Sequence, residues 1–177
     1  MKLFWVSLVV ASLGCAGCGQ KDSAAQPSGR SAEGRSVSAV PDQPIRNPFP
    51  GAREVRLFVA TGQDDKDEPI YSKRAGLALS PVQRAKLESL ISVHTISPDE
   101  MFAMCFMPHH FFRYFDKAGK PVGEIAVCFC CTGVGQSGAS NIRLTTSQML
   151  SANFGELKSF VHSLGERTDV QCDSGPS

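Results

Sequence analysis

The chain lacks the features that mark several large classes of protein function. It has 177 residues with one tryptophan and two tyrosines, and 18 basic against 17 acidic residues leave a net charge of only +1. A nucleic-acid-binding domain would show a clustered basic excess, so this balance argues against nucleic acid as a partner. The apolar run over residues 3–13 is too short to span a bilayer. The length predicts one domain with tails.

Motifs of common enzymatic chemistry are also missing. No serine lies in a nucleophile elbow and no segment carries a zinc-protease helix. The glycine-rich stretch 132–138 has neither the lysine nor the helix start of a phosphate-binding loop. We therefore name no catalytic residue, and the sequence leans away from an enzyme.

The N-terminal residues have the pattern of an export signal that ends in cysteine. Met1-Lys2 is a short positive start, and residues 3–13 form an uncharged apolar core. The segment Ser-Leu-Gly-Cys-Ala-Gly-Cys-Gly over 12–19 resembles the lipobox of bacterial lipoproteins. The resemblance implies a diacylglyceryl thioether on Cys18, cleavage before it and an acylated amino terminus; Cys15 is the alternative attachment site.

This resemblance gives an expected location and one expected partner. Each buried CH₂ contributes about 0.8 kcal/mol, so two or three acyl chains would hold the protein at a membrane. We expect a lipoprotein of the bacterial cell envelope that faces the periplasm or the exterior. An ordinary cleaved secretory signal is the alternative. The sequence identifies no protein partner or ligand.

Composition divides the chain into four segments. The stretch after the signal is rich in Ser, Gly, Ala, Gln and Pro and has no apolar period, which is typical of a disordered tether. Near its end, Ile45 or Phe49 is expected to contact the domain. The expected order is a signal peptide over 1–17, a disordered tether over 18–52, a folded domain over 53–166 and a flexible tail over 167–177.

Local patterns predict an α+β domain with a small antiparallel sheet. Val55, Leu57 and Val59 share one face of a β-prone run. Helical spacing of apolar residues predicts amphipathic helices over about 81–94 and 149–164, the first starting at Ser80-Pro81 and ending near His94, which we interpret as structural. A second helical turn is expected near Ser97, a glycine-rich connection over 132–138 and a short strand over 141–145. The two helices would cover one face of the sheet.

Two aromatic runs around a glycine turn predict a central β-hairpin over about 105–131. Asp116 and Gly119 fit a type I turn with a glycine bulge, which pairs Asp116 with Lys120. A slip of one residue would exchange the two faces. Counting outward predicts the pairs Tyr114–Val122, Phe112–Glu124, His110–Ala126, Pro108–Cys128 and Cys105–Cys131. Period two then predicts the more apolar face to hold His109, Phe111, Ile125, Val127 and Phe129, and the other to hold His110, Phe112, Tyr114 and Cys128.

The open end of this hairpin carries a cysteine and histidine cluster. Its residues are Cys105, Phe106, Pro108 and His110 on one arm and Cys128, Phe129 and Cys131 on the other, with Asp116 and Gly119 between them. This pattern resembles a group of small exported bacterial proteins with a Cys-aromatic-x-Pro-x-His … Cys-Phe-x-Cys hairpin. The resemblance adds weight to Cys105, His110, Cys128 and Cys131 as a set and implies no activity.

Three hypotheses fit this cluster. Five cysteines follow the export signal, and an odd number leaves one that is free, metal-bound or paired between molecules. The first hypothesis is structural: a Cys105–Cys131 disulfide, with Cys128 or Cys130 paired to Cys172, in a cysteine-stabilised binding or structural module. The second is a Zn²⁺ or Cu(I) site formed by Cys105, His110, Cys128 and Cys131. The third is thiol-disulfide redox chemistry over 128–131, with His110 or His109 supplying positive charge.

Overall fold

The computed structural model describes residues 42–66, 68–100, 106–170 and 172. They form two antiparallel sheets and two helices, which confirms the α+β class with antiparallel sheets. The expected signal peptide with Cys15 and Cys18, and also Cys105, lie outside the described residues. Among the helices of the described part, none is long and apolar enough to cross a membrane.

The larger sheet has six strands. Its order is β3-β2-β6-β7-β8, and β4 pairs with β2 beside that path. The long strand β2 carries the apolar alternation seen in the sequence, with Val55, Leu57 and Val59 all buried. The strands are β2 (Glu54–Gln63), β3 (Pro69–Tyr71), β4 (Leu77–Ala78), β6 (His110–Phe115), β7 (Pro121–Cys128) and β8 (Gly133–Gly138).

The smaller sheet has three strands in the order β1-β5-β9. These are β1 (Gln43–Pro44), β5 (Ile91–Thr95) and β9 (Gln148–Ala152). Two of them replace ends of the expected helices: residues 91–94 were expected in the first helix and residues 149–152 in the second. The β-branched Ile91, Val93 and Thr95 favour a strand, and antiparallel pairing of β5 with β9 satisfies its backbone.

Both helices begin where their sequences place a cap. Helix α1 (Pro81–Leu90) has Ser80 as its N-cap, and Ser80 and Gln83 form a reciprocal capping box. Helix α2 (Phe154–Ser163) has Asn153 as its N-cap, whose side chain accepts from the Glu156 amide at 3.2 Å. It ends before Gly165, which has φ +78° and so takes the left-handed conformation that glycine tolerates.

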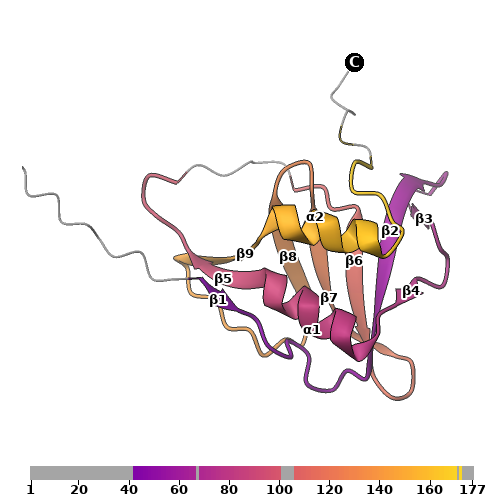
Figure 1. The fold of residues 1–177 in the computed structure, drawn as a ribbon, viewed down its shortest axis with the longest axis horizontal. Coiled ribbons are helices and arrows are strands. Elements are labelled where there is room, and N and C mark those ends of the chain that lie inside the picture. Colours follow the sequence, from indigo (N-terminus) through magenta and orange to yellow (C-terminus); the bar gives the residue numbers. More distant parts are fainter. Residues whose placement is uncertain (1–41, 67, 101–105, 171, 173–177) are drawn as a thin grey trace, which may run out of the picture. The chain divides into compact units, whose positions relative to one another are not determined.

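The core lies between the two helices and one face of the six-stranded sheet (Figure 1). Burial of these apolar side chains is the main source of stability for such a domain. The buried sheet residues include Val55, Leu57, Val59, Phe112, Tyr114, Ile125 and Val127, and the buried helix residues are Leu87, Leu90, Leu157, Phe160 and Val161.

The register between β6 and β7 differs by one residue from the expected one. The turn itself has the expected pair, since the Asp116 amide donates to the Lys120 carbonyl at 2.9 Å. A bulge then shifts the register: Phe115 pairs with Pro121, whereas Tyr114 pairs with Gly123. His110 consequently faces Val127 instead of Ala126, and the predicted division of faces is wrong.

The bulge has a packing reason. It places His110, Phe112 and Tyr114 on the same buried face as Ile125 and Val127. The apolar residues of both strands therefore point into one core, whereas the expected register would have sent one set to the opposite face.

The strand after the hairpin is rich in glycine. Residues 133–138 form β8 and not a connection, and residues 141–145 contain no strand. A Cβ on Gly133 or Gly135 would lie 2.7 or 3.0 Å from the Phe106 ring. Glycine thus lets Phe106 lie directly on this edge strand.

The segment before β2 packs on the domain. Ile45 and Phe49 are buried, and the Phe49 ring lies 4.7 Å from the Tyr114 ring, centroid to centroid. The Asn47 amide donates to Glu88 of α1 at 2.9 Å. The end of the expected tether thus contributes directly to the core.

Candidate functional site

Four cysteines form two disulfides just after β7. Cys128 ends the strand and is bonded to Cys131, with their Cα atoms 5.6 Å apart. Cys130 lies between them and is bonded to Cys172, with a Cα separation of 5.1 Å. The turn over 129–132 thus carries both bonds. Cys128 is 2% exposed, Cys131 half-buried and Cys130 exposed.

This pairing corrects the expected partner of Cys131 and selects between the two expected partners of Cys172. Cys131 was expected to bond Cys105, but it bonds Cys128, which lies three residues before it. A tight turn returns the chain so that the two sulfurs meet, and the Cys131 amide donates to the Cys128 sulfur at 3.2 Å. Of the two partners considered for Cys172, the structure has Cys130.

His110 lies beneath this turn and is 1% exposed. Its Nε2 lies 2.6 Å from the Arg167 carbonyl oxygen, and its ring meets the Phe129 ring edge-on at 4.7 Å. Since a carbonyl only accepts, Nε2 carries the proton. Burial lowers the pKa of His110. His110 is therefore a neutral donor that holds the C-terminal segment.

The expected metal set does not converge among the described residues. Cys128 and Cys131 are bonded to each other, and His110 uses Nε2 for the Arg167 carbonyl. Within residues 42–66, 68–100, 106–170 and 172, no group of three or more His, Cys, Asp and Glu side chains is arranged to hold a metal. His109 precedes β6, and its carbonyl accepts from the Ala60 amide at 2.8 Å.

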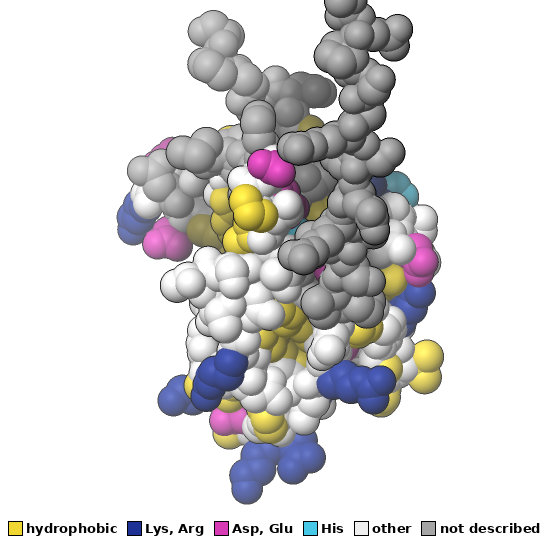
Figure 2. Space-filling view, turned by 90° about the vertical axis from the view of Figure 1, so that its left-hand side faces the viewer, with side chains coloured by type: hydrophobic (Ala, Val, Ile, Leu, Met, Phe, Trp, Pro, Cys, Tyr) yellow, Lys and Arg dark blue, Asp and Glu magenta, His cyan; other side chains and the backbone are white. Residues whose placement is uncertain are grey.

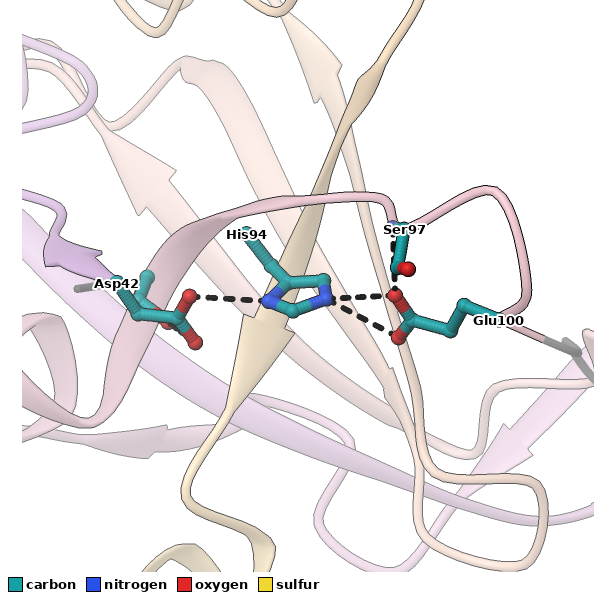
Figure 3. A network of polar contacts seen from close by, with 5 residues as sticks. Asp42, His94, Ser97 and Glu100 are labelled. Carbon is teal, nitrogen blue, oxygen red and sulfur yellow. Dashed lines mark hydrogen bonds and ion pairs between the residues drawn. The ribbon is translucent and has the colours of Figure 1, made fainter. Parts of the chain in front are cut away.

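A second polar cluster was missed by sequence reasoning. His94 was placed at a helix end, but it lies in β5 and joins two carboxylates (Figure 3). Its Nδ1 is 2.9 Å from Asp42 Oδ1, and its Nε2 is 2.9 Å from Glu100 Oε2. Carboxylates only accept, so both ring nitrogens donate and the imidazole is charged.

The pKa shift of His94 and the hydrogen bonds of Glu100 are consistent with a charged imidazole between two carboxylates. The hydrogen bonds that His94 donates to Glu100 (the larger effect) and to Asp42 raise the pKa of His94. Glu100 Oε2 also accepts from the Ser97 amide at 3.1 Å, which is half of the expected capping box, although Ser97 precedes a turn at Pro98 and Asp99 and residues 97–100 are not helical. The Ser97–Glu100 spacing was visible in the sequence; the contribution of Asp42 was not.

No family model, curated protein or solved structure matches the chain.

Proposed function

We propose that the protein is a lipid-anchored component of the bacterial cell envelope whose domain is a disulfide-stabilised binding or structural module. The observation that supports this most is the pair of disulfides at the end of β7. Disulfides persist in oxidising compartments such as the periplasm and the cell surface. An exported, lipidated amino terminus, as the lipobox resemblance implies, would deliver the domain to such a compartment.

The C-terminal segment supports a structural role for these bonds. Cys130–Cys172 and the contact from His110 to Arg167 fasten residues 167–172 to the end of the sheet. Lys73 and Ser72 both bind Glu166, the first through a 2.8 Å ion pair. These contacts fix the described C-terminal residues to the rest of the domain.

Lipidation is tested by mass spectrometry of the full chain produced in a bacterial host. We expect the wild type and Cys15→Ser to carry a diacylglyceryl mass and to partition into detergent, and Cys18→Ser to lose both. Lipid retained in Cys18→Ser and lost in Cys15→Ser would move the attachment site. A protein that is exported without any added lipid would refute the anchor.

Thiol titration tests the module itself. Four of the five cysteines after the signal are bonded, so the denatured, unreduced protein should show one free thiol, that of Cys105. After reduction, four further thiols should appear. Free thiols at all five positions together with a bound zinc or copper ion would refute the disulfide module and support the metal alternative.

A second candidate function is thiol-disulfide exchange at Cys128–Cys131. The observation that favours it is the four-residue ring with an amide donating to the Cys128 sulfur, since such a donor stabilises a thiolate. A substrate thiolate would attack the Cys131 sulfur, form a mixed disulfide and release the Cys128 thiolate. A second substrate thiol would then displace Cys131, which oxidises the substrate and reduces the pair.

This candidate has its own test. The oxidised protein should convert a model dithiol to its disulfide in a single turnover, and Cys131→Ser should abolish the reaction. Cys172→Ser is the matched control, because it removes the other disulfide and leaves this ring intact. No dithiol oxidation by the wild type would leave the bond purely structural.

A further inference from the structure

A cavity of about 440 Å³ lies beside the three-stranded sheet. One wall of the cavity is formed by residues that pair across β1, β5 and β9. Gln43 of β1 pairs with Val93 of β5, and Thr95 of β5 pairs with Gln148 of β9. The opposite wall is the segment 141–143. His94 alternates to the other face of β5, so the cavity is distinct from the His94 cluster.

Two arginines line this cavity without a carboxylate between them. Arg46 and Arg143 both contribute to its wall, and none of the lining residues is acidic. Among the described residues Arg46 makes no hydrogen bond or ion pair, and Arg143 donates to the Ser140 carbonyl at 2.9 Å. Four of the six other arginines in the described residues are paired with a carboxylate, in Arg56–Glu54, Arg84–Glu88, Arg113–Glu124 and Arg167–Asp169.

The remaining lining combines apolar and neutral polar groups. Ile45, Val93 and Ile142 supply apolar surface. Figure 2 faces the end of the domain where β1, β5 and β9 lie, and it shows a hollow with hydrophobic side chains inside and basic side chains on both sides. Six of the ten lining residues are polar or charged, so the cavity offers hydrogen-bonding groups together with a smaller apolar surface.

We propose that this cavity binds a small organic anion: a carboxylate or phosphate group attached to a short apolar chain. The guanidinium groups of Arg46 and Arg143 bind the anion, since their planar donor arrays match carboxylate and phosphate oxygens. Ile45, Val93 and Ile142 contact the apolar chain. This ligand class goes beyond the proposed function, because neither the lipid anchor nor the disulfides bear on the cavity.

The test is calorimetric titration of the full chain in non-ionic detergent with hexanoate and hexyl phosphate. Hexanol and hexyltrimethylammonium are the uncharged and charge-inverted probes and should show no binding. Arg46→Gln and Arg143→Gln should each weaken anion binding about tenfold or more, because hydrogen bonds between charged groups contribute more than neutral ones. The double variant should abolish it. Tighter binding of one anion assigns the carboxylate or the phosphate.

Matched variants keep the test decisive. Arg74→Gln removes an exposed arginine that does not line the cavity and should leave affinity unchanged. Thr95→Phe should block the cavity by volume without changing charge, and so weaken both anions. Equal thermal unfolding of all variants excludes a folding defect. Two results would overturn the proposal. One is anion binding that survives in the double arginine variant. The other is no anion binding to the wild type at probe concentrations up to about 10 mM, which corresponds to a very weak affinity.

Discussion

Cys130 and Cys172 are bonded although 42 residues separate them in the sequence. The bond joins the turn after β7 to the last described residue of the chain. His110 holds Arg167 from beneath, and His162 holds Thr168 through a 3.0 Å hydrogen bond. The described part of the expected flexible tail is therefore fixed at several points, and its largest constraint is covalent.

Removing this disulfide should destabilise the domain strongly. Closing a loop of this length restricts the unfolded chain, which corresponds to about 4 kcal/mol of stability. We expect Cys172→Ser and the double variant with Cys130→Ser to lose a similar amount, measured as the free energy of unfolding in urea. In excess reductant the difference from wild type should disappear. Equal stability of wild type and variants in oxidising buffer would contradict a structural role.

What sequence reasoning predicted well is local. The start of α1 follows from Ser80 and Pro81, whose capping groups lie within one turn. The buried alternation of Val55, Leu57 and Val59 follows from the two-residue period of a strand. In each case the residues that determine the structure are neighbours in the sequence.

The features that sequence reasoning missed depend on residues that lie far apart in the sequence. Helical spacing continued past Leu90, but pairing of β5 with β9, about sixty residues away, ends the helix there. The register of β6 and β7 depends on a bulge beside Gly123, against which the distant Phe49 packs. The candidate site also depends on residues that local patterns could not select. Asp42, which contacts His94, lies in the expected tether. Cys131 bonds Cys128, and the sequence spacing did not favour Cys128 over Cys105 as its partner.

Substituting Gly123 should show how far the register depends on Phe49. A Cβ at this position would overlap the Phe49 ring, so either the ring or the strand must move. We expect Gly123→Ala to cost about 1–3 kcal/mol, as overpacking of a core usually does. The measurement is urea unfolding of the variant and wild type.

Gly62→Ala is the control for this substitution. Gly62 is also in a strand of the large sheet, and a Cβ there meets nothing within 4 Å. Its effect should stay within about 0.5 kcal/mol. Equal effects of the two substitutions would show that Phe49 does not constrain Gly123.

His110 should make the domain less stable in mild acid. Its pKa is lowered in the folded state by burial, so below about 6.5 the unfolded chain binds a proton that the folded protein does not. The His110 contribution to stability should be constant above that pH and fall below it. In His110→Gln this fall, measured by urea unfolding between about pH 5 and 7, should be reduced. An unchanged slope in the variant would assign the acid sensitivity to other groups.

His94 should have the opposite sign and a different pH range. Its pKa is raised in the folded state, so its contribution is complete below about 6.5 and is lost as the pH rises through the folded value. Each of its two partly exposed ion pairs should contribute about 0.2–1 kcal/mol. His94→Gln should therefore destabilise the domain at about pH 6 and much less at about pH 9, by urea unfolding.

Lys86→Gln gives the matched comparison for His94. Lys86 forms an exposed 2.7 Å ion pair with Glu156, and this pair contains no imidazole. Its removal should therefore cost the same at both pH values. The His94 effect should also shrink in high salt, because the ions screen exposed charges. If the pH dependence above 6.5 persists in His94→Gln, the charged bridge from Asp42 to Glu100 does not stabilise the fold.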